Sequence, residues 1–118
     1  MVKINWTPLS LSDLKNVFDY IAEDSNRYAQ ITVNKIYLRV SGLDKQPFSG
    51  RIVPEFEDKK IRELIDGNYR IVYEIISESQ IDILRIFHSA RKLKKDNIIN
   101  TRFAQGSVES IVKYVKST

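Results

Sequence analysis

Apolar and polar residues alternate at the start of the chain and then change to a spacing of three or four residues. Residues 2–6 alternate in this way, which is typical of a strand with one buried face. Pro8 ends this strand, and we expect Ser10 or Ser12 to cap a helix with Asp13 in its first turn. Apolar residues then recur at helical spacing, at Leu11, Leu14, Val17, Phe18, Ile21 and Ala22.

A second helical pattern covers residues 28–43, with Gly42 near its end. Its apolar positions are Ala29, Val33, Ile36, Val40 and Leu43. Because only a short polar break separates the two patterns, we expect an antiparallel helical hairpin. Residues 44–54 contain two prolines and a glycine and are expected to form a surface loop.

Three strands are predicted next, over residues 61–65, 69–76 and 81–87. The separators, "DGN" and "SES", are short and polar, so the strands are expected to pair as an antiparallel meander. The predicted fold class is α+β: an N-terminal strand, an antiparallel helical hairpin and a three-stranded meander. The helices should pack on one sheet face and leave the other face partly open. The side chains expected against the hairpin are Trp6, Ile71, Tyr73, Ile83 and Leu84.

We assign residues 1–95 to a single domain and residues 96–118 to a C-terminal extension. An apolar stripe in the extension indicates a last helix that starts at Ser107. The stripe consists of Val108, Ile111, Val112 and Val115.

The chain has no cysteine, and His88 is its only histidine. Disulfides, cysteine zinc sites, thiol nucleophiles and multi-histidine metal sites are therefore excluded, and we expect neither a metal nor another cofactor. The N-terminus lacks an apolar leader segment, and no apolar run approaches the length of a bilayer span. We therefore expect a cytoplasmic protein without a membrane partner.

The net charge of +4 is unevenly distributed. Residues 1–58 carry 7 basic and 8 acidic side chains, a balance of −1, whereas residues 59–118 carry 12 and 7, a balance of +5. Residues 83–95 contain no acidic side chain. They contain five basic ones, namely Arg85, Arg91, Lys92, Lys94 and Lys95. This run suits an anionic partner such as DNA, RNA or an acidic peptide, and it also suits a solvated basic surface.

Arg70 lies within an otherwise apolar strand pattern. Alternation along residues 69–76 places it on the opposite face from the row formed by Tyr69, Ile71, Tyr73 and Ile75. Two roles are open: Arg70 binds an anion on the exposed sheet face, or it forms an ion pair with Glu63, Glu74 or another acid.

Glu55 precedes the meander and His88 follows its last strand. With Arg70 they are the set that a metal-free ribonuclease needs: a base, an acid and a cation for the transition-state charge. Each also has a simpler interpretation, because Glu55 could be an exposed loop carboxylate and His88 a structural or exposed histidine.

Residues 50–93, "GRIVPEFEDKKIRELIDGNYRIVYEIISESQIDILRIFHSARKL", combine the elements P-E, I-R-E-L, Y-R-I-V-Y and H-x-x-R at fixed separations. This combination resembles the C-terminal half of RelE/ParE toxins of bacterial type II toxin–antitoxin systems. The resemblance covers residues 2–95. It implies a cytoplasmic toxin of a plasmid stabilisation-like system, which inhibits growth and is neutralised by a cognate antitoxin.

The family that the chain resembles has two branches, DNA gyrase inhibitors and ribosome-dependent messenger-RNA endonucleases. The resemblance places Arg70 on the strand arginine that holds the scissile phosphate in the nucleases, and Glu55 near the base of the YoeB-like members. Those nucleases end their last strand in a His-Tyr pair, whereas this chain has "FHSARKL" without the tyrosine. Because its H-x-x-R ending is similar to ParE-like members, we expect gyrase poisoning, a non-enzymatic action.

Two alternatives to gyrase poisoning remain open. The first is ribosome-dependent messenger-RNA cleavage, with Glu55, Arg70 and His88 as the catalytic residues. The second is a basic binding module without toxicity. For contact with the target or with nucleic acid we expect Arg62, Arg70, Arg85, Arg91 and Lys92.

Overall fold

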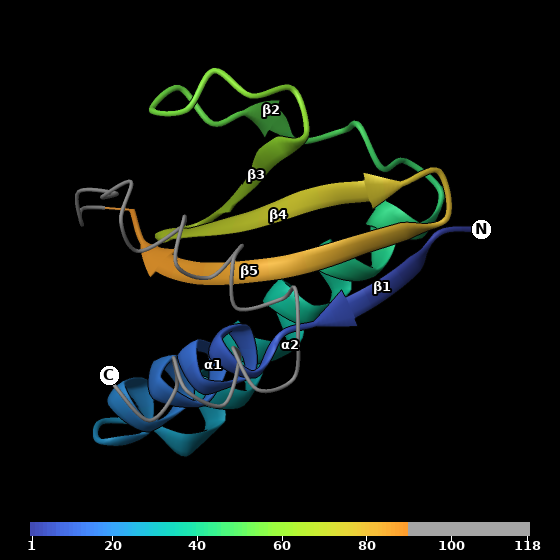
Figure 1. Cartoon of the computed structure of the whole chain (residues 1–118). Helices are drawn as coiled ribbons and strands as arrows, with labels where there is room; N and C mark the ends of the chain where they lie inside the picture. The colour runs from blue at the N-terminus through green and yellow to red at the C-terminus, as the bar shows by residue number, and fades with distance from the viewer. Residues whose placement is uncertain (90–118) are drawn as a thin grey trace.

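The computed structural model of the protein describes residues 1–89, in which two helices lie on one side of a five-stranded sheet (Figure 1). The elements are β1 (Lys3–Trp6), α1 (Pro8–Ala22), α2 (Asn26–Ser41), a 3-10 turn (Gly42–Asp44), β2 (Arg51–Ile52), β3 (Ile61–Asp66), β4 (Tyr69–Ser77) and β5 (Gln80–His88). The predicted helix after Ser107 and the boundary at residue 95 lie outside the described residues.

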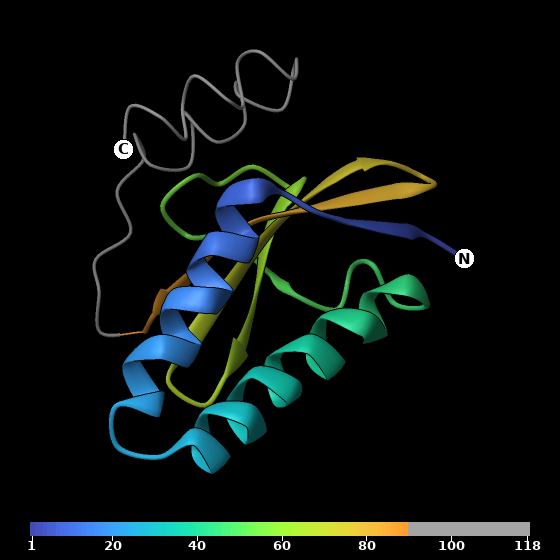
Figure 2. The same cartoon turned by 90° about the horizontal axis from the view of Figure 1, so that it is seen from below.

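The sheet has the strand order β1-β5-β4-β3-β2. The three predicted strands form the expected meander, β3 to β5, and β1 pairs with β5 in parallel. Figure 2 shows α1 and α2 joined at one end and diverging toward the other beneath the sheet. The predicted α+β class and the helical hairpin are confirmed.

The helix α1 begins earlier than predicted, because Thr7 caps it in place of Ser10 or Ser12. The Thr7 hydroxyl oxygen accepts a hydrogen bond from the Ser10 amide at 3.2 Å and donates to the Ile83 carbonyl oxygen at 2.7 Å. Pro8 is the first helical residue, where its fixed φ is favourable and its missing N–H costs nothing. Asp13 therefore lies beyond the first turn, and its carboxylate contacts β5.

The helix α2 runs from Asn26 to Ser41, about two residues earlier at each end than predicted. The Ser25 hydroxyl accepts a hydrogen bond from the Tyr28 amide at 3.1 Å and caps the helix. The apolar spacing located the buried face of this helix, whereas a polar cap outside that spacing sets its start.

The main core lies between the hairpin and the sheet. Its fully buried members include Ile36 and Val40 of α2 and Ile71, Tyr73 and Ile83 of the sheet. Trp6 is half-buried beside this core, and its ring stacks on Tyr37 with centroids 6.2 Å apart.

Leu84 is buried as predicted, but on the opposite face of the sheet from the hairpin. A β-bulge explains the arrangement of β5: Tyr73 pairs with Ile83 and Val72 with Arg85, so Leu84 is an extra residue. Beyond the bulge Ile86 packs with the helix-facing core, whereas Phe87 packs with Leu84.

The sheet face opposite the helices is more covered than predicted. A second core cluster lies there, and the half-buried Phe56 packs against it; its members are Val53, Ile61, Val72, Leu84 and Phe87. Val53 and Phe56 come from the segment that follows β2, and β2 itself falls in the region predicted to be a loop.

Tyr73 and Gly50 explain why β2 forms. The buried Tyr73 hydroxyl accepts a hydrogen bond from the Gly50 amide at 3.0 Å and donates to the Pro47 carbonyl oxygen at 2.8 Å. A Cβ at Gly50 would lie 2.6 Å from the Glu63 carbonyl oxygen, so only glycine fits at this approach. Contacts from distant residues therefore hold the chain in register against β3.

Candidate functional site

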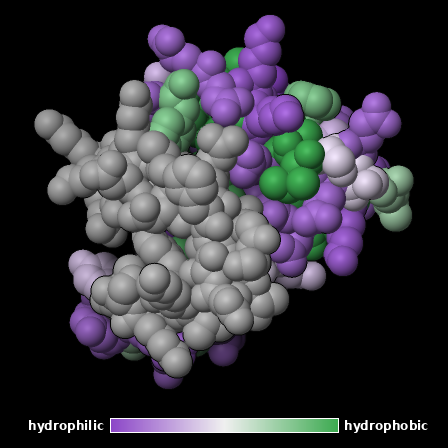
Figure 3. Space-filling view, viewed as in Figure 1, coloured by the Kyte–Doolittle hydropathy of each residue, from purple (hydrophilic) through white to green (hydrophobic). Residues whose placement is uncertain are grey.

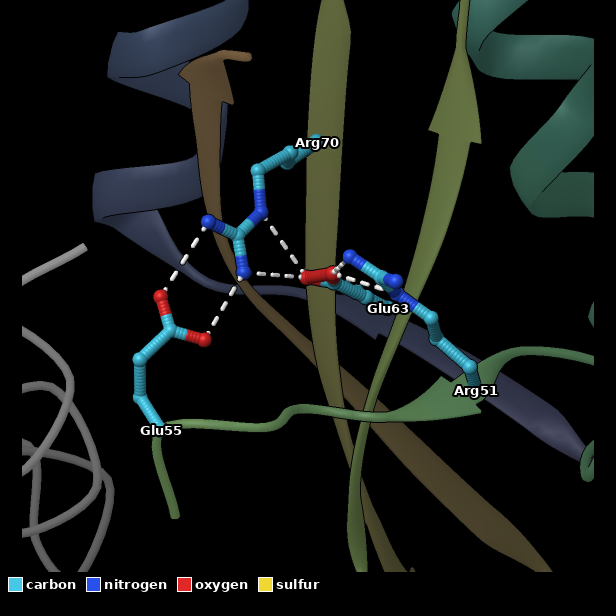
Figure 4. Close-up of polar contacts among 4 residues, drawn as sticks. All are labelled: Arg51, Glu55, Glu63 and Arg70. Carbon is cyan, nitrogen blue, oxygen red and sulfur yellow. Dashed lines mark hydrogen bonds and ion pairs between the residues drawn. The ribbon is translucent and has the colours of Figure 1, made fainter. Parts of the chain in front are cut away.

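Arg70 on β4 points away from the helices, toward the second core cluster, and its side chain is largely buried. One edge of its guanidinium group faces Glu63 of β3. Its Nε donates to Glu63 Oε2 at 2.8 Å, and its Nη2 donates to the same oxygen at 2.5 Å (Figure 4). The charge inside this strand pattern is thus paired directly with a carboxylate of the neighbouring strand.

The other edge of the same guanidinium group is occupied by Glu55. Arg70 Nη1 donates to Glu55 Oε2 at 3.2 Å and Nη2 to Glu55 Oε1 at 3.1 Å, a bidentate contact. The hydrogen bonds from Arg70 lower the pKa of Glu55 below its ordinary value of 4.5, although partial burial opposes this shift. Glu55 is therefore a deprotonated carboxylate whose two oxygens are both engaged.

Glu63 is the buried centre of the cluster, with a side chain that is 0% exposed. Its Oε1 accepts a hydrogen bond from Arg51 Nε at 2.9 Å and forms an ion pair with Arg51 Nη2 at 2.8 Å, whereas Arg51 itself is 61% exposed. A buried carboxylate is tolerated only when it is paired and hydrogen-bonded. The two flanking arginines meet this requirement, and we call Arg51, Glu55, Glu63 and Arg70 the Arg–Glu cluster.

Burial alone would lower the pKa of Arg70. The hydrogen bonds from its guanidinium group to Glu55 and Glu63 outweigh that effect, and the pKa of Arg70 is raised. Of the two roles that the sequence left open, the ion pair is present, and its partners are Glu63 and Glu55 rather than Glu74.

His88 lies on the helix-facing side of the sheet, apart from the Arg–Glu cluster. It pairs with Tyr69 across β4 and β5, and the two rings make an edge contact with centroids 5.6 Å apart. Arg70 pairs with Phe87 and therefore projects from the other face. The structure brings Glu55 and Arg70 together but does not bring His88 to the same side.

Arg62 binds backbone carbonyl groups of the preceding loop. Its Nη1 donates to the Gly50 oxygen at 3.0 Å and to the Phe48 oxygen at 3.3 Å, and its Nε donates to the Lys59 oxygen at 3.0 Å. Its guanidinium carbon also lies 5.0 Å from the Phe48 ring centroid. These contacts give Arg62 a role in holding the loop.

Arg85 is held by Asp13 of α1, to which Nε donates at 2.8 Å and Nη2 at 3.1 Å. The Asp13 carboxylate also accepts a hydrogen bond from the Ile86 amide at 2.9 Å, so it ties α1 to the edge of β5. Arg91 and Lys92, the other two expected binding residues, lie outside the described residues.

The sequence did not indicate Arg51 as a member of the cluster, because a single arginine beside a glycine has no pattern. It also did not indicate a hollow of about 430 Å³ between the end of the hairpin and the β3–β4 turn. Aromatic side chains from four elements line that hollow, namely Tyr20, Tyr28, Tyr69 and His88.

Within residues 1–89, no three His, Cys, Asp or Glu side chains gather in a way that could hold a metal ion. In the same part of the chain, neither helix has both the length and the apolar character that a bilayer crossing requires. In the space-filling view, hydrophilic residues cover most of the described surface facing the viewer, and a small hydrophobic patch lies among them (Figure 3).

Comparison with known proteins agrees with this fold. The family model for the ParE toxin of the type II toxin–antitoxin system parDE matches residues 4–93. A solved chain from a chromosomal ParDE toxin–antitoxin system of P. aeruginosa is similar, with a TM-score of 0.61 and 24% sequence identity over 75% of this chain and 96% of that chain. No curated protein sequence matches this chain.

A helical hairpin packs on a meander that a parallel N-terminal strand extends, and this arrangement is a small α+β fold. The chain belongs to the ParE toxin family of type II toxin–antitoxin systems. The predicted resemblance to the RelE/ParE superfamily, on its ParE-like side, is confirmed.

Proposed function

We propose that this protein is the toxin of a type II toxin–antitoxin pair and that it inhibits growth by binding DNA gyrase, without catalysing a reaction itself. The proposal includes a cognate antitoxin that neutralises it and a cytoplasmic site of action, where gyrase and its DNA are found. Membership of the ParE toxin family supports the toxin role.

One observation carries the preference for binding over catalysis: His88 does not converge with Glu55 and Arg70, which contact each other. General acid–base catalysis needs a base within hydrogen-bond reach of its proton and an acid on the leaving group. The Glu55 carboxylate is occupied by Arg70, and His88 projects from the other sheet face. This arrangement favours a protein that acts by contact.

We propose Arg91 and Lys92 as the residues that contact the target. The basic residues of the described part that we expected to bind already serve the fold, since Arg62 holds a loop and Arg85 holds α1. Arg91 and Lys92 belong to the basic run that gives the second half of the chain its positive balance.

The deciding experiment compares two activities of the purified protein. We expect inhibition of gyrase supercoiling and no cleavage of messages on translating ribosomes. Site-specific message cleavage without an effect on gyrase would replace this proposal with the nuclease alternative, and the absence of both activities would favour a non-toxic binding module.

The proposed contact residues are tested in the same gyrase assay. Replacing Arg91 and Lys92 by alanine should weaken inhibition, and the difference from the wild type should shrink as ionic strength rises, because salt screens the attraction that these charges provide. Lys15→Ala is the matched control, since it removes an exposed lysine of α1 that pairs with Asp19. Equal inhibition by the double variant and the control would remove these residues from the target contact.

A further inference from the structure

The segment between β2 and β3 lies over the sheet face opposite the helices and makes two kinds of contact there. Phe56 packs against the second core cluster, and Glu55 makes its bidentate contact with Arg70 (Figure 4). Two neighbouring residues thus place an acidic and an aromatic side chain on the sheet. A bound peptide with an acidic and an aromatic side chain would make the same two contacts with this surface.

The contacts of Glu55 differ from those of the other acid in the cluster. Glu63 is fully buried, and two arginines bind it. Glu55 is about one-third exposed and lies on a loop, and Arg70 is the side chain that binds it. Loss of Glu55 from the cluster therefore requires no movement of a strand.

The backbone next to Glu55 is also in an uncommon conformation. Glu57 has a φ of 54°, the one positive φ of a non-glycine residue among residues 1–89. A left-handed conformation is unfavourable for a residue with a Cβ, so the loop conformation that brings Glu55 to Arg70 carries local backbone strain.

We propose that Glu55 and Phe56 occupy a peptide-binding site of this protein, and that a partner polypeptide displaces them with an acidic residue next to a large apolar residue. The incoming carboxylate takes the outer edge of the Arg70 guanidinium group. Arg51 and Glu63 stay in place and keep that group oriented.

Charge and shape favour a peptide carboxylate at this position. With Glu55 present the Arg–Glu cluster has two positive and two negative groups, and without it one positive charge is left over. The guanidinium edge already accepts a planar carboxylate in bidentate geometry. The apolar cluster beside it supplies a place for an aromatic ring, which a phosphate alone would leave unused.

The test uses the full chain and a synthetic peptide of its own segment, "IVPEFED", residues 52–58. Glu55→Ala should bind this peptide at least about ten-fold more tightly than the wild-type chain, because the site is no longer occupied from within. Binding is measured by isothermal titration calorimetry, which applies to every variant, and the NMR signal of the Arg70 Nε–H group reports the contact in the chains that keep Arg70. Glu55→Gln, which keeps the shape of the side chain, is the second variant in case the alanine variant does not fold.

Three controls isolate the carboxylate contact. Arg70→Lys in the Glu55→Ala background, and a peptide with glutamine in place of its first glutamate, should each remove the gain in affinity. Inorganic phosphate should compete only weakly with the peptide. Equal affinity of wild type and variant, no binding by either, or competition by phosphate as strong as that of the peptide would each overturn the proposal.

An antitoxin is one source of such a segment. The binding test needs neither toxicity nor gyrase, so it can fail while the gyrase assay succeeds, and the reverse can also occur.

Discussion

The Asp13 carboxylate of α1 accepts two hydrogen bonds from the Arg85 guanidinium group of β5, at 2.8 and 3.1 Å. Both side chains are nearly buried, and the residues are 72 positions apart in the sequence. Asp13→Ala should lower the free energy of unfolding by about 3–5 kcal/mol, because it removes the carboxylate to which the Arg85 guanidinium group and the Ile86 amide both donate.

Chemical denaturation measures this loss, and Asp19→Ala is the matched control. Asp19 pairs with Lys15 on the surface of the same helix, where the side chains are 56% and 77% exposed. An exposed pair contributes about 0–1 kcal/mol. If the two variants lost equal stability, the pair between Asp13 and Arg85 would not link helix and sheet as described.

The two acids of the Arg–Glu cluster should differ in their effect on stability. Glu63→Gln should cost about 3–5 kcal/mol, because it leaves a buried position between two arginines without negative charge. Glu55→Gln should cost about 1 kcal/mol or less, since Glu55 is partly exposed and Arg70 keeps Glu63. A larger loss for Glu55→Gln in urea denaturation would contradict this order.

Gly50 and Gly42 should respond in opposite directions to alanine. At Gly50 the added Cβ would lie 2.6 Å from the Glu63 carbonyl oxygen, so Gly50→Ala should destabilise the protein by about 1–3 kcal/mol. At Gly42 no atom lies within 4 Å of that position and φ is −65°, so Gly42→Ala should add about 0.4–1 kcal/mol. Thermal unfolding of both variants checks the signs.

Glu55 should also make stability depend on pH in the acid range. Its pKa is lowered on folding, so the unfolded chain binds more protons than the folded chain between the folded pKa and 4.5. This contribution is fully present above pH 4.5 and is lost as pH falls through the folded value. Urea denaturation of wild type and Glu55→Gln across this range should show a shallower slope for the variant, and parallel slopes would argue against the ion pair.

The strands of the meander could be predicted because each has an apolar pattern that is complete within itself. The strand β2 could not be predicted, because its two residues are too few to show an apolar pattern. The contact between Tyr73 and Gly50 holds them in place. The start of α1 was missed for a related reason: the Thr7 hydroxyl serves both as helix cap and as a donor to β5, and only the folded chain brings these together.

The candidate site was predicted in part. Strand alternation placed Glu63 within reach of Arg70, and Glu63 was named as one possible partner; Glu55 lies on a loop, where no alternation could indicate its contact with Arg70. The side of the sheet on which His88 lies could not be predicted, because the bulge at Leu84 reverses which side the residues at the end of β5 face. A signal for the bulge exists in the sequence, since Ile83 and Leu84 are adjacent apolar residues and break the alternation of β5.

The parallel pairing of β1 with β5 has a consequence for synthesis of the protein. Lys3 lies opposite Gln80 and Trp6 opposite Ile83, so the first strand finds its only neighbour in the described sheet 77 residues later. Contacts of such separation must wait for the intervening chain to be closed into a loop. A nascent chain that stops before β5 therefore lacks the strand on which its own N-terminus depends, and truncated products cannot display the finished sheet.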